Sequence, residues 1–252
     1  MGTWRKAALW GDEHTELGAI AVAELPPRAA VALSRGRFPK GYPHFDPNED
    51  AVLAATDGSA WLLAVADGHN GFDAARAALT ALQAAAPPTL AGAATDPEAA
   101  LRAGLILAGE AVTEALTHVH EDRAASATAL TVALVVGDRL TTLTLGDTAA
   151  VLVRDGRARR IGGPTGFLGA GADLSGAGVD RADLHPGETV VVASDGLFDF
   201  LGRSPDRVLA RLAARPGESP AGLARAAVEQ ACAGGAGDNI AVALLYDSPR
   251  MG

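Results

Sequence analysis

Short apolar runs separated by turn residues are the main feature of the hydrophobic pattern, and they predict a chain rich in strands. Two of these runs, over residues 51–55 and 61–66, flank the turn Asp57-Gly58-Ser59 and predict a β-hairpin. Residues 18–34 predict an opening strand that is broken at Pro26-Pro27. Further runs predict strands over residues 130–136, 140–145, 149–154, 189–193 and 240–246.

Longer segments with helix start signals lie between these strands. A helix over about 72–86 is expected to stop at Pro87-Pro88, because proline lacks the backbone N–H that a helix interior needs. Asp96 can cap a second helix that reaches about residue 118. Ser-Pro pairs at 204–205 and 219–220 predict two more helices by the same capping logic.

The order of elements is therefore strands, two helices, strands, two helices and a final strand. Strands joined by short turns favour antiparallel sheets with helices packed outside them, which is an α+β fold in a single domain over residues 1–252. Residues 36–46, rich in glycine, proline and aromatic residues, predict a loop, and the glycine-rich residues 162–177 predict a mobile flap or loop. The sequence contains neither a dinucleotide-binding glycine fingerprint nor a Walker-type phosphate loop.

Composition narrows the classes of function. Hydrophobic residues make up 48% and charged residues 20%, as in ordinary soluble proteins, and no apolar stretch is long enough for a membrane helix. The N-terminus lacks the apolar core of a signal peptide, so a cytoplasmic protein without membrane contact is expected. The single Cys232 excludes an internal disulfide or a cysteine-built zinc site.

The balance of charged residues limits the classes of binding partner. The chain has 21 basic and 30 acidic residues, and a net charge of −9 argues against nucleic-acid binding. Nearly all basic residues are arginines, which together with abundant alanine and glycine suggests a bacterial coding sequence. The sequence indicates no oligomer, so a monomer is the default expectation.

Carboxylates recur where apolar strands end beside a glycine or a turn. The four places are residues 48–50 (Asn-Glu-Asp), 66–69 (Ala-Asp-Gly-His), 194–196 (Ser-Asp-Gly) and 237–239 (Gly-Asp-Asn). The sheet fixes the backbone there, glycine permits close approach, and Mg²⁺ and Mn²⁺ prefer oxygen ligands. Each pair alone is typical of an ordinary turn, but four in one acidic chain favour a metal site. No Gly-x-Ser-x-Gly nucleophile motif competes with it.

The order and spacing of these motifs resemble the metal-dependent protein phosphatase 2C family over roughly residues 30–247. The resemblance rests on the stretches PNEDAV (47–52), VADGHNG (65–71), SATALTVALV (126–135), LGDTAAVLVRDG (145–156), VVASDGLFDFLG (191–202) and GDNIAVALLYD (237–247). It implies a four-layer α/β/β/α sandwich, in which two antiparallel sheets are flanked by helices. This agrees with the fold class predicted from the hydrophobic pattern.

The resemblance also implies a centre of two Mg²⁺ or Mn²⁺ ions, with a third in a looser site. Asp67 would bridge the two ions. Glu49 and the carbonyl of Gly68 would complete one site, and Asp195 and Asp238 would bind the other.

Further residues take roles from the same resemblance. Asp50 would orient a metal-bound water, and the bridging hydroxide would attack phosphorus in line. His69 matches the general acid for the leaving alcohol, and the alternative is a residue that only orients waters. Asp199 matches a ligand of the third site, whereas Asp122 matches its partner only with a one-residue shift. Asn239 is expected to hold the loop rather than to bind metal.

Two departures from the family pattern affect the substrate. Phe45 stands where the family usually has a phosphate-binding arginine, and Arg35, Arg37 or Lys40 could replace it or remain solvated surface charges. The region between Asp147 and Asp195 is short and lacks the usual flap motif, which would open the site to bulky proteins or retune it for a small metabolite.

The sequence is compatible with three functions. The leading one is a phosphoserine/phosphothreonine protein phosphatase that depends on Mg²⁺ or Mn²⁺. The second keeps the metal centre but hydrolyses a small phosphate ester, which Phe45 and the altered flap would favour. The third is a pseudophosphatase that serves as a binding or regulatory module, which the complete acidic set Glu49, Asp67, Asp195 and Asp238 disfavours.

Overall fold

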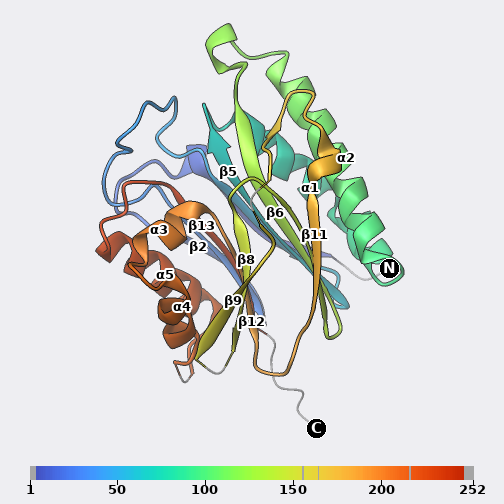
Figure 1. The fold of residues 1–252 in the computed structure, drawn as a ribbon, viewed down its shortest axis with the longest axis vertical. Helices are drawn as coiled ribbons and strands as arrows, with labels where there is room; N and C mark the ends of the chain where they lie inside the picture. The colour runs from blue at the N-terminus through green and yellow to red at the C-terminus, as the bar shows by residue number, and fades with distance from the viewer. Residues whose placement is uncertain (1–3, 155, 164, 216, 247–252) are drawn as a thin grey trace.

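Two antiparallel sheets lie face to face, and helices cover the outer face of each (Figure 1). The computed structural model describes residues 4–154, 156–163, 165–215 and 217–246. Within these residues the first sheet has seven strands: in spatial order β1 (Arg5–Trp10), β4 (Ala51–Thr56), β5 (Ala60–His69), β6 (Ala127–Val136), β7 (Arg139–Leu145) and β11 (Gly178–Asp183), with β10 (Leu168–Gly169) paired to β6. The second has six: β2 (Ala21–Leu25), β3 (Ala29–Ser34), β13 (Ile240–Tyr246), β12 (Thr189–Ala193), β8 (Ala149–Arg154) and β9 (Arg157–Ile161).

The helices divide between the two sheets. The first sheet is covered by α1 (Asp73–Ala93) and α2 (Pro97–Leu116), and the second by α3 (Asp195–Phe200), α4 (Pro205–Ala213) and α5 (Pro220–Ala233). Short 3₁₀ turns occur at η1 (Gly11–Glu13), η2 (Glu121–Arg123) and η3 (Leu174–Gly176). The predicted α/β/β/α fold class is confirmed.

The layering explains why the strands read as continuous apolar runs. In β5, Leu62 and Ala64 face the helices α1 and α2, whereas Leu63 and Val65 face the second sheet. Successive side chains of a strand point to opposite faces, and here both faces are buried. Each inner strand therefore contributes to two of the three apolar layers.

The predicted hairpin and helix starts are confirmed. Strands β4 and β5 pair with Ala51 opposite Ala66, as the runs around Asp57-Gly58-Ser59 predicted. The Asp96 carboxylate accepts a hydrogen bond from the amide of Ala99 at 3.0 Å and caps α2. Ser219 caps α5 in the same way, whereas Ser204 makes no side-chain cap bond although α4 begins directly after it.

The predicted end of the first helix is wrong. Helix α1 continues through Pro87 and Pro88 and ends at Ala93. Leu90 and Ala93, beyond the prolines, are buried in the layer between the helices and the first sheet. Burial of this continuing apolar face therefore outweighs the hydrogen bonds that the prolines remove.

Strands β1, β9 and β11 were not predicted, and all three lie at the edges of the sheets. Edge strands expose one side and commonly carry charged residues, which interrupts the apolar pattern. Exposed charged residues of this kind are Arg157 and Arg159 in β9 and Arg181 and Asp183 in β11.

The glycine-rich segment 162–177, predicted as a loop, contains some regular secondary structure. It contains the short strand β10 and the turn η3, and Leu168 is buried against the first sheet. Pro164 in this segment, and Asp155 and Asp247 in the family-like stretches, lie outside the described residues. The predicted loop over 36–46 is confirmed. Among the described helices, none has the length and apolar character that crossing a membrane requires.

Candidate metal centre

Carboxylates from both sheets meet at one end of the sandwich. Glu49 and Asp50 directly precede β4, and Asp67 lies in the last part of β5. Asp195 follows β12 as the first residue of α3, and Asp238 lies two residues before β13. Because neighbouring strands run antiparallel, the start of one lies beside the end of the next. With Asp147, between β7 and β8, and Asp199 on α3, these residues are called the acidic cluster.

Two glycines of this region allow the strand ends to approach closely. A Cβ atom at Gly68 would lie 2.4 Å from the carbonyl oxygen of Glu49, and one at Gly196 would lie 2.0 Å from the carbonyl oxygen of Asn239. Real side chains do not fit at such distances. The Asp-Gly pairs at 67–68 and 195–196 therefore have a packing role that an ordinary turn would not require.

Buried amides hold the backbone around Glu49. The Asn239 side chain accepts a hydrogen bond from the Glu49 amide at 2.9 Å and donates to the carbonyls of Arg35 and Pro47. The Glu49 carboxylate in turn accepts a bond from the amide of Gly71 at 2.7 Å. Asn239 thus joins three segments, in agreement with the structural role expected for it.

In one half of the acidic cluster, the carboxylates form no ion pair with a lysine or arginine of the described residues. Both carboxylate oxygens of Asp50 are buried and have no hydrogen-bond partner among the described residues. Burial, with the charges of Asp238 and Asp195, raises the pKa of Asp50 to about 8 despite the opposing effect of Lys40. Burial and nearby carboxylates also raise the pKa of Asp67, which donates to Asp195 when protonated.

Asp147 belongs to this half and was not predicted as a site residue. One oxygen of Asp147 lies with ligand atoms of Asp67 and His69 in a group whose members are all within 4.8 Å of one another. Asp147 also lies near Asp195, since its charge contributes to the raised pKa of Asp195. The signal was present in the sequence, because Gly146-Asp147 also follows a buried strand.

His69 stands at the edge of the cluster. Its Nε2 atom is 3.9 Å from Asp67 Oδ1 and has no hydrogen-bond partner among the described residues. The ring packs edge-on against Phe167, with centroids 4.7 Å apart, and the side chain is 35% exposed. The imidazole is thus partly open to solvent, whereas its Nε2 atom is buried beside Asp67.

The other half of the cluster is paired with a lysine and a tyrosine. Lys40 Nζ lies 2.7 Å from Glu49 Oε2 and 3.4 Å from Asp238 Oδ1. Burial acts to lower the pKa of Lys40, but the attraction of Asp50, Glu49 and Asp238 outweighs it and raises that pKa. The Tyr42 hydroxyl donates to both carboxylate oxygens of Asp238, at 2.9 and 3.0 Å.

The predicted phosphate-binding arginines lie outside the cluster. Arg35 donates to the carbonyl of Thr15 at 2.9 Å, and Arg37 lies over the ring of Phe38. Neither guanidinium forms an ion pair within the described residues. Phe45, at the position of the family arginine, is 46% exposed. Of the loop cations named from the sequence, it is Lys40 that contacts the carboxylates.

The two acids suggested for a third metal differ in their surroundings. Asp199 lies one turn after Asp195 on α3 and contributes to the raised pKa of Asp195. Asp122 is exposed, and its carboxylate bonds to the ring of His120 at 2.8 Å. Asp147 is therefore better placed than Asp122 to accompany Asp195 and Asp199.

The donor set fits hard divalent cations. All candidate ligands are oxygens, and the unpartnered oxygens of Asp50 and Asp147 are buried beside carboxylates that disfavour one another's ionisation. A divalent cation would supply the missing positive charge. The acidic cluster is thus able to hold metal ions.

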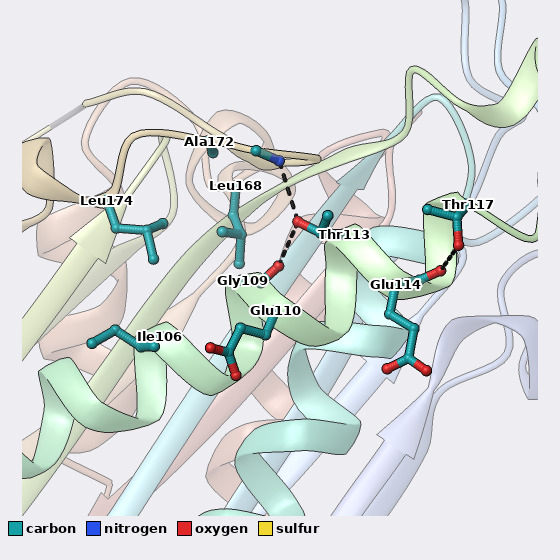
Figure 2. A pocket seen from close by; sticks show the side chains of 10 residues that line it. Ile106, Gly109, Glu110, Thr113, Glu114, Thr117, Leu168, Ala172 and Leu174 are labelled. Atoms are coloured by element: carbon teal, nitrogen blue, oxygen red, sulfur yellow. Dashed lines mark hydrogen bonds between the residues drawn. The ribbon is translucent and has the colours of Figure 1, made fainter.

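A separate apolar cavity lies between α2 and the segment 168–174. Figure 2 shows Leu168 and Leu174 facing Ile106 across it, and its volume is about 440 Å³. Thr113 accepts a hydrogen bond from the amide of Gly171 at 3.2 Å and ties the segment to α2. The residues that line this cavity do not include the acidic cluster.

Comparisons with known proteins agree with the layered fold. A family model described as protein phosphatase 2C matches residues 44–226. No curated protein matches the chain by sequence.

Several solved structures share the fold. The Mycobacterium tuberculosis serine/threonine phosphatase PstP/Ppp is 22% identical with a TM-score of 0.70, covering 92% of this chain and 99% of that one. The PstP catalytic domain in complex with two manganese ions is 23% identical with a TM-score of 0.69, covering 90% and 98%. The phosphatase MsPP from Mycobacterium smegmatis, in complex with cacodylate, is 26% identical with a TM-score of 0.64, covering 87% and 97%.

Proposed function

Because the chain belongs to the protein phosphatase 2C family, we propose that it hydrolyses phosphoserine and phosphothreonine in proteins with the help of Mg²⁺ or Mn²⁺. The observation that carries the proposal is the acidic cluster, in which Asp50 keeps both carboxylate oxygens buried without a hydrogen-bond partner among the described residues. Such oxygens are costly in the ionised carboxylate unless a cation reaches them. The manganese ions of the PstP catalytic domain support the choice of ion.

We assign the ligands to two ions. Asp67 would contact both of them. The Glu49 carboxylate and the Gly68 carbonyl would complete one site, and Asp195 and Asp238 would complete the other. Their position at the meeting strand ends supports this assignment. A third, looser site would use Asp199, for which Asp147 is a closer companion than Asp122.

Two groups would handle protons during hydrolysis. Bound divalent ions would supply an activated water and offset the charge of the phosphoryl oxygens. Asp50 would accept a hydrogen bond from the attacking water and so orient it. His69 would donate a proton from its ring to the leaving serine or threonine oxygen, and its half-buried position supports that role.

The test compares two substrates in the same preparation. Hydrolysis of para-nitrophenyl phosphate and of a phosphothreonine peptide is measured with and without Mn²⁺. Manganese-dependent turnover of the peptide is the expected result. Absence of bound metal together with absence of turnover would contradict the proposal and leave a pseudophosphatase.

A small phosphate ester is the second candidate substrate. The observation in its favour is Phe45, whose exposed ring replaces a cation that would bind phosphate. Turnover of para-nitrophenyl phosphate without turnover of the peptide would select this alternative.

The net charge of the chain bears on the class of substrate. A net charge of −9 supports a substrate other than nucleic acid. The cytoplasmic location and the monomeric state of the chain stay predictions from the sequence. Sedimentation of the purified chain would test the monomer.

A further inference from the structure

Lys40 is a buried lysine inside a proposed metal centre. Its side chain is 3% exposed, and its ammonium group contacts Glu49 at 2.7 Å and Asp238 at 3.4 Å. These two carboxylates belong to different ions in the proposed assignment. A single ammonium group therefore occupies oxygens that both metal sites would use.

The loop that carries Lys40 is fastened to the same end of the sandwich. The amides of Arg37 and Phe38 both donate to the carbonyl of Ala236, at 2.8 and 2.9 Å. At Gly36, where φ is +93°, a Cβ atom would lie 2.3 Å from the carbonyl oxygen of Asp238. The backbone just before Lys40 is thus held against the segment that supplies Asp238.

Tyr42 also lies beside the lysine. Its hydroxyl donates to Asp238, and the ammonium group of Lys40 lies 5.4 Å from the centre of its ring. A buried ammonium is stable only when it is paired, and here two carboxylates and an aromatic face pair it. The position of Lys40 is therefore built into the fold of the loop.

We propose that Lys40 is a tethered cation that competes with divalent metal for Glu49 and Asp238, so that the metal centre fills only when the ammonium group leaves. This inference rests on the proposed function. Metal ions and ammonium would need the same oxygens, and their like charges repel at such short range. A site that is occupied for most of the time by its own lysine binds metal with a correspondingly reduced apparent affinity.

The first experiment measures Mn²⁺ binding directly, by electron paramagnetic resonance of free Mn²⁺ and by calorimetry. Lys40→Met removes the charge, keeps an unbranched side chain that is one atom shorter, and adds only a soft thioether that Mn²⁺ does not favour. We expect this variant to bind Mn²⁺ roughly tenfold more tightly or better than the wild type. Lys40→Arg, which keeps the charge, should remain close to the wild type.

The chain provides a matched control, because Lys6 is its only other lysine. Lys6 is exposed on β1, and Lys6→Met should bind Mn²⁺ like the wild type. Equal or weaker binding by Lys40→Met would overturn the competition while leaving the metal centre in place. Failure of every variant to bind Mn²⁺ would instead overturn the proposed function, and the role of Lys40 with it.

The second experiment uses the unmodified chain and so does not depend on a variant that folds. Reductive methylation of lysines is followed by mass spectrometry, with and without Mn²⁺. Without metal, Lys40 should react several times more slowly than Lys6. Mn²⁺ should raise the labelling of Lys40 severalfold and leave Lys6 unchanged. Labelling of Lys40 that stays equally slow at saturating Mn²⁺ would overturn the proposal.

Discussion

The two halves of the acidic cluster contain the same chemical groups and tolerate burial in different ways. Glu49 and Asp238 are paired with Lys40 and Tyr42. Within the part of the chain that the structure describes, Asp50 and Asp67 have no lysine or tyrosine at hydrogen-bond distance, and their pKa values rise. In the absence of metal, a buried carboxylate either acquires a cation or holds a proton. One half would therefore be prepared for metal by release of a lysine, and the other by loss of protons.

The largest expected effect comes from the unpaired half. Asp195→Asn removes one negative charge from the proposed ligand set and should lower kcat/KM for a phosphothreonine peptide by several orders of magnitude, while circular dichroism shows a folded chain. Asp183→Asn, on the exposed end of β11, is the control and should behave like the wild type. Near-normal turnover by Asp195→Asn would contradict its assignment as a ligand.

A smaller effect separates Asp147 from Asp122. Asp147→Asn should reduce kcat by about 10- to 100-fold, because it contributes an oxygen beside Asp67 and His69. Asp122→Asn should change kcat by less than about twofold, because its carboxylate is exposed and contacts His120. The reverse order of effects would restore Asp122 as the partner of Asp199.

The pH dependence of stability tests the protonated half. The folded state retains a proton on Asp50 over the range from 3.8 to about 8, whereas the unfolded chain has released it. The free energy of unfolding of the metal-free protein should therefore fall as pH rises through this range. Asp50→Asn removes this pH-dependent contribution. At pH 8 with EDTA, the free energy of unfolding of this variant should therefore exceed that of the wild type by more than about 1 kcal/mol.

Urea unfolding at pH 5 and at pH 8 measures this difference. The gap between Asp50→Asn and the wild type should narrow toward acid pH. Parallel stability curves across the range would show that Asp50 does not hold the proton.

The smallest effect is expected in the paired half. Tyr42→Phe removes the hydroxyl that donates to Asp238 and should lower the free energy of unfolding of the metal-free protein by about 0.5–1.5 kcal/mol. Saturating Mn²⁺ should reduce this loss of stability, because the bound ion would then compensate the negative charge of Asp238. An equal loss of stability with and without Mn²⁺ would show that the contribution of Tyr42 does not depend on metal binding.

Much of the fold was predictable because the inner strands are buried on both faces. The apolar runs at 51–55, 61–66 and 189–193 correspond to β4, β5 and β12. The edge strands β9 and β11 were missed, because solvent exposure lets them carry arginine and aspartate. The continuation of α1 past Pro87 was missed because packing beyond the prolines is absent from a local pattern.

The family-like motifs, the α+β order and the carboxylates at the strand ends were predictable from the amino-acid sequence, since each depends on residues close together in the chain. Which charges meet depends instead on the tertiary structure. It brought Lys40 to Glu49 and Asp238, left Arg35 and Arg37 at other contacts, and placed Asp147 beside Asp67. These pairings depend on how loops and strands from both sheets converge. Electrostatic energy falls with distance in space, and local sequence spacing does not specify that distance.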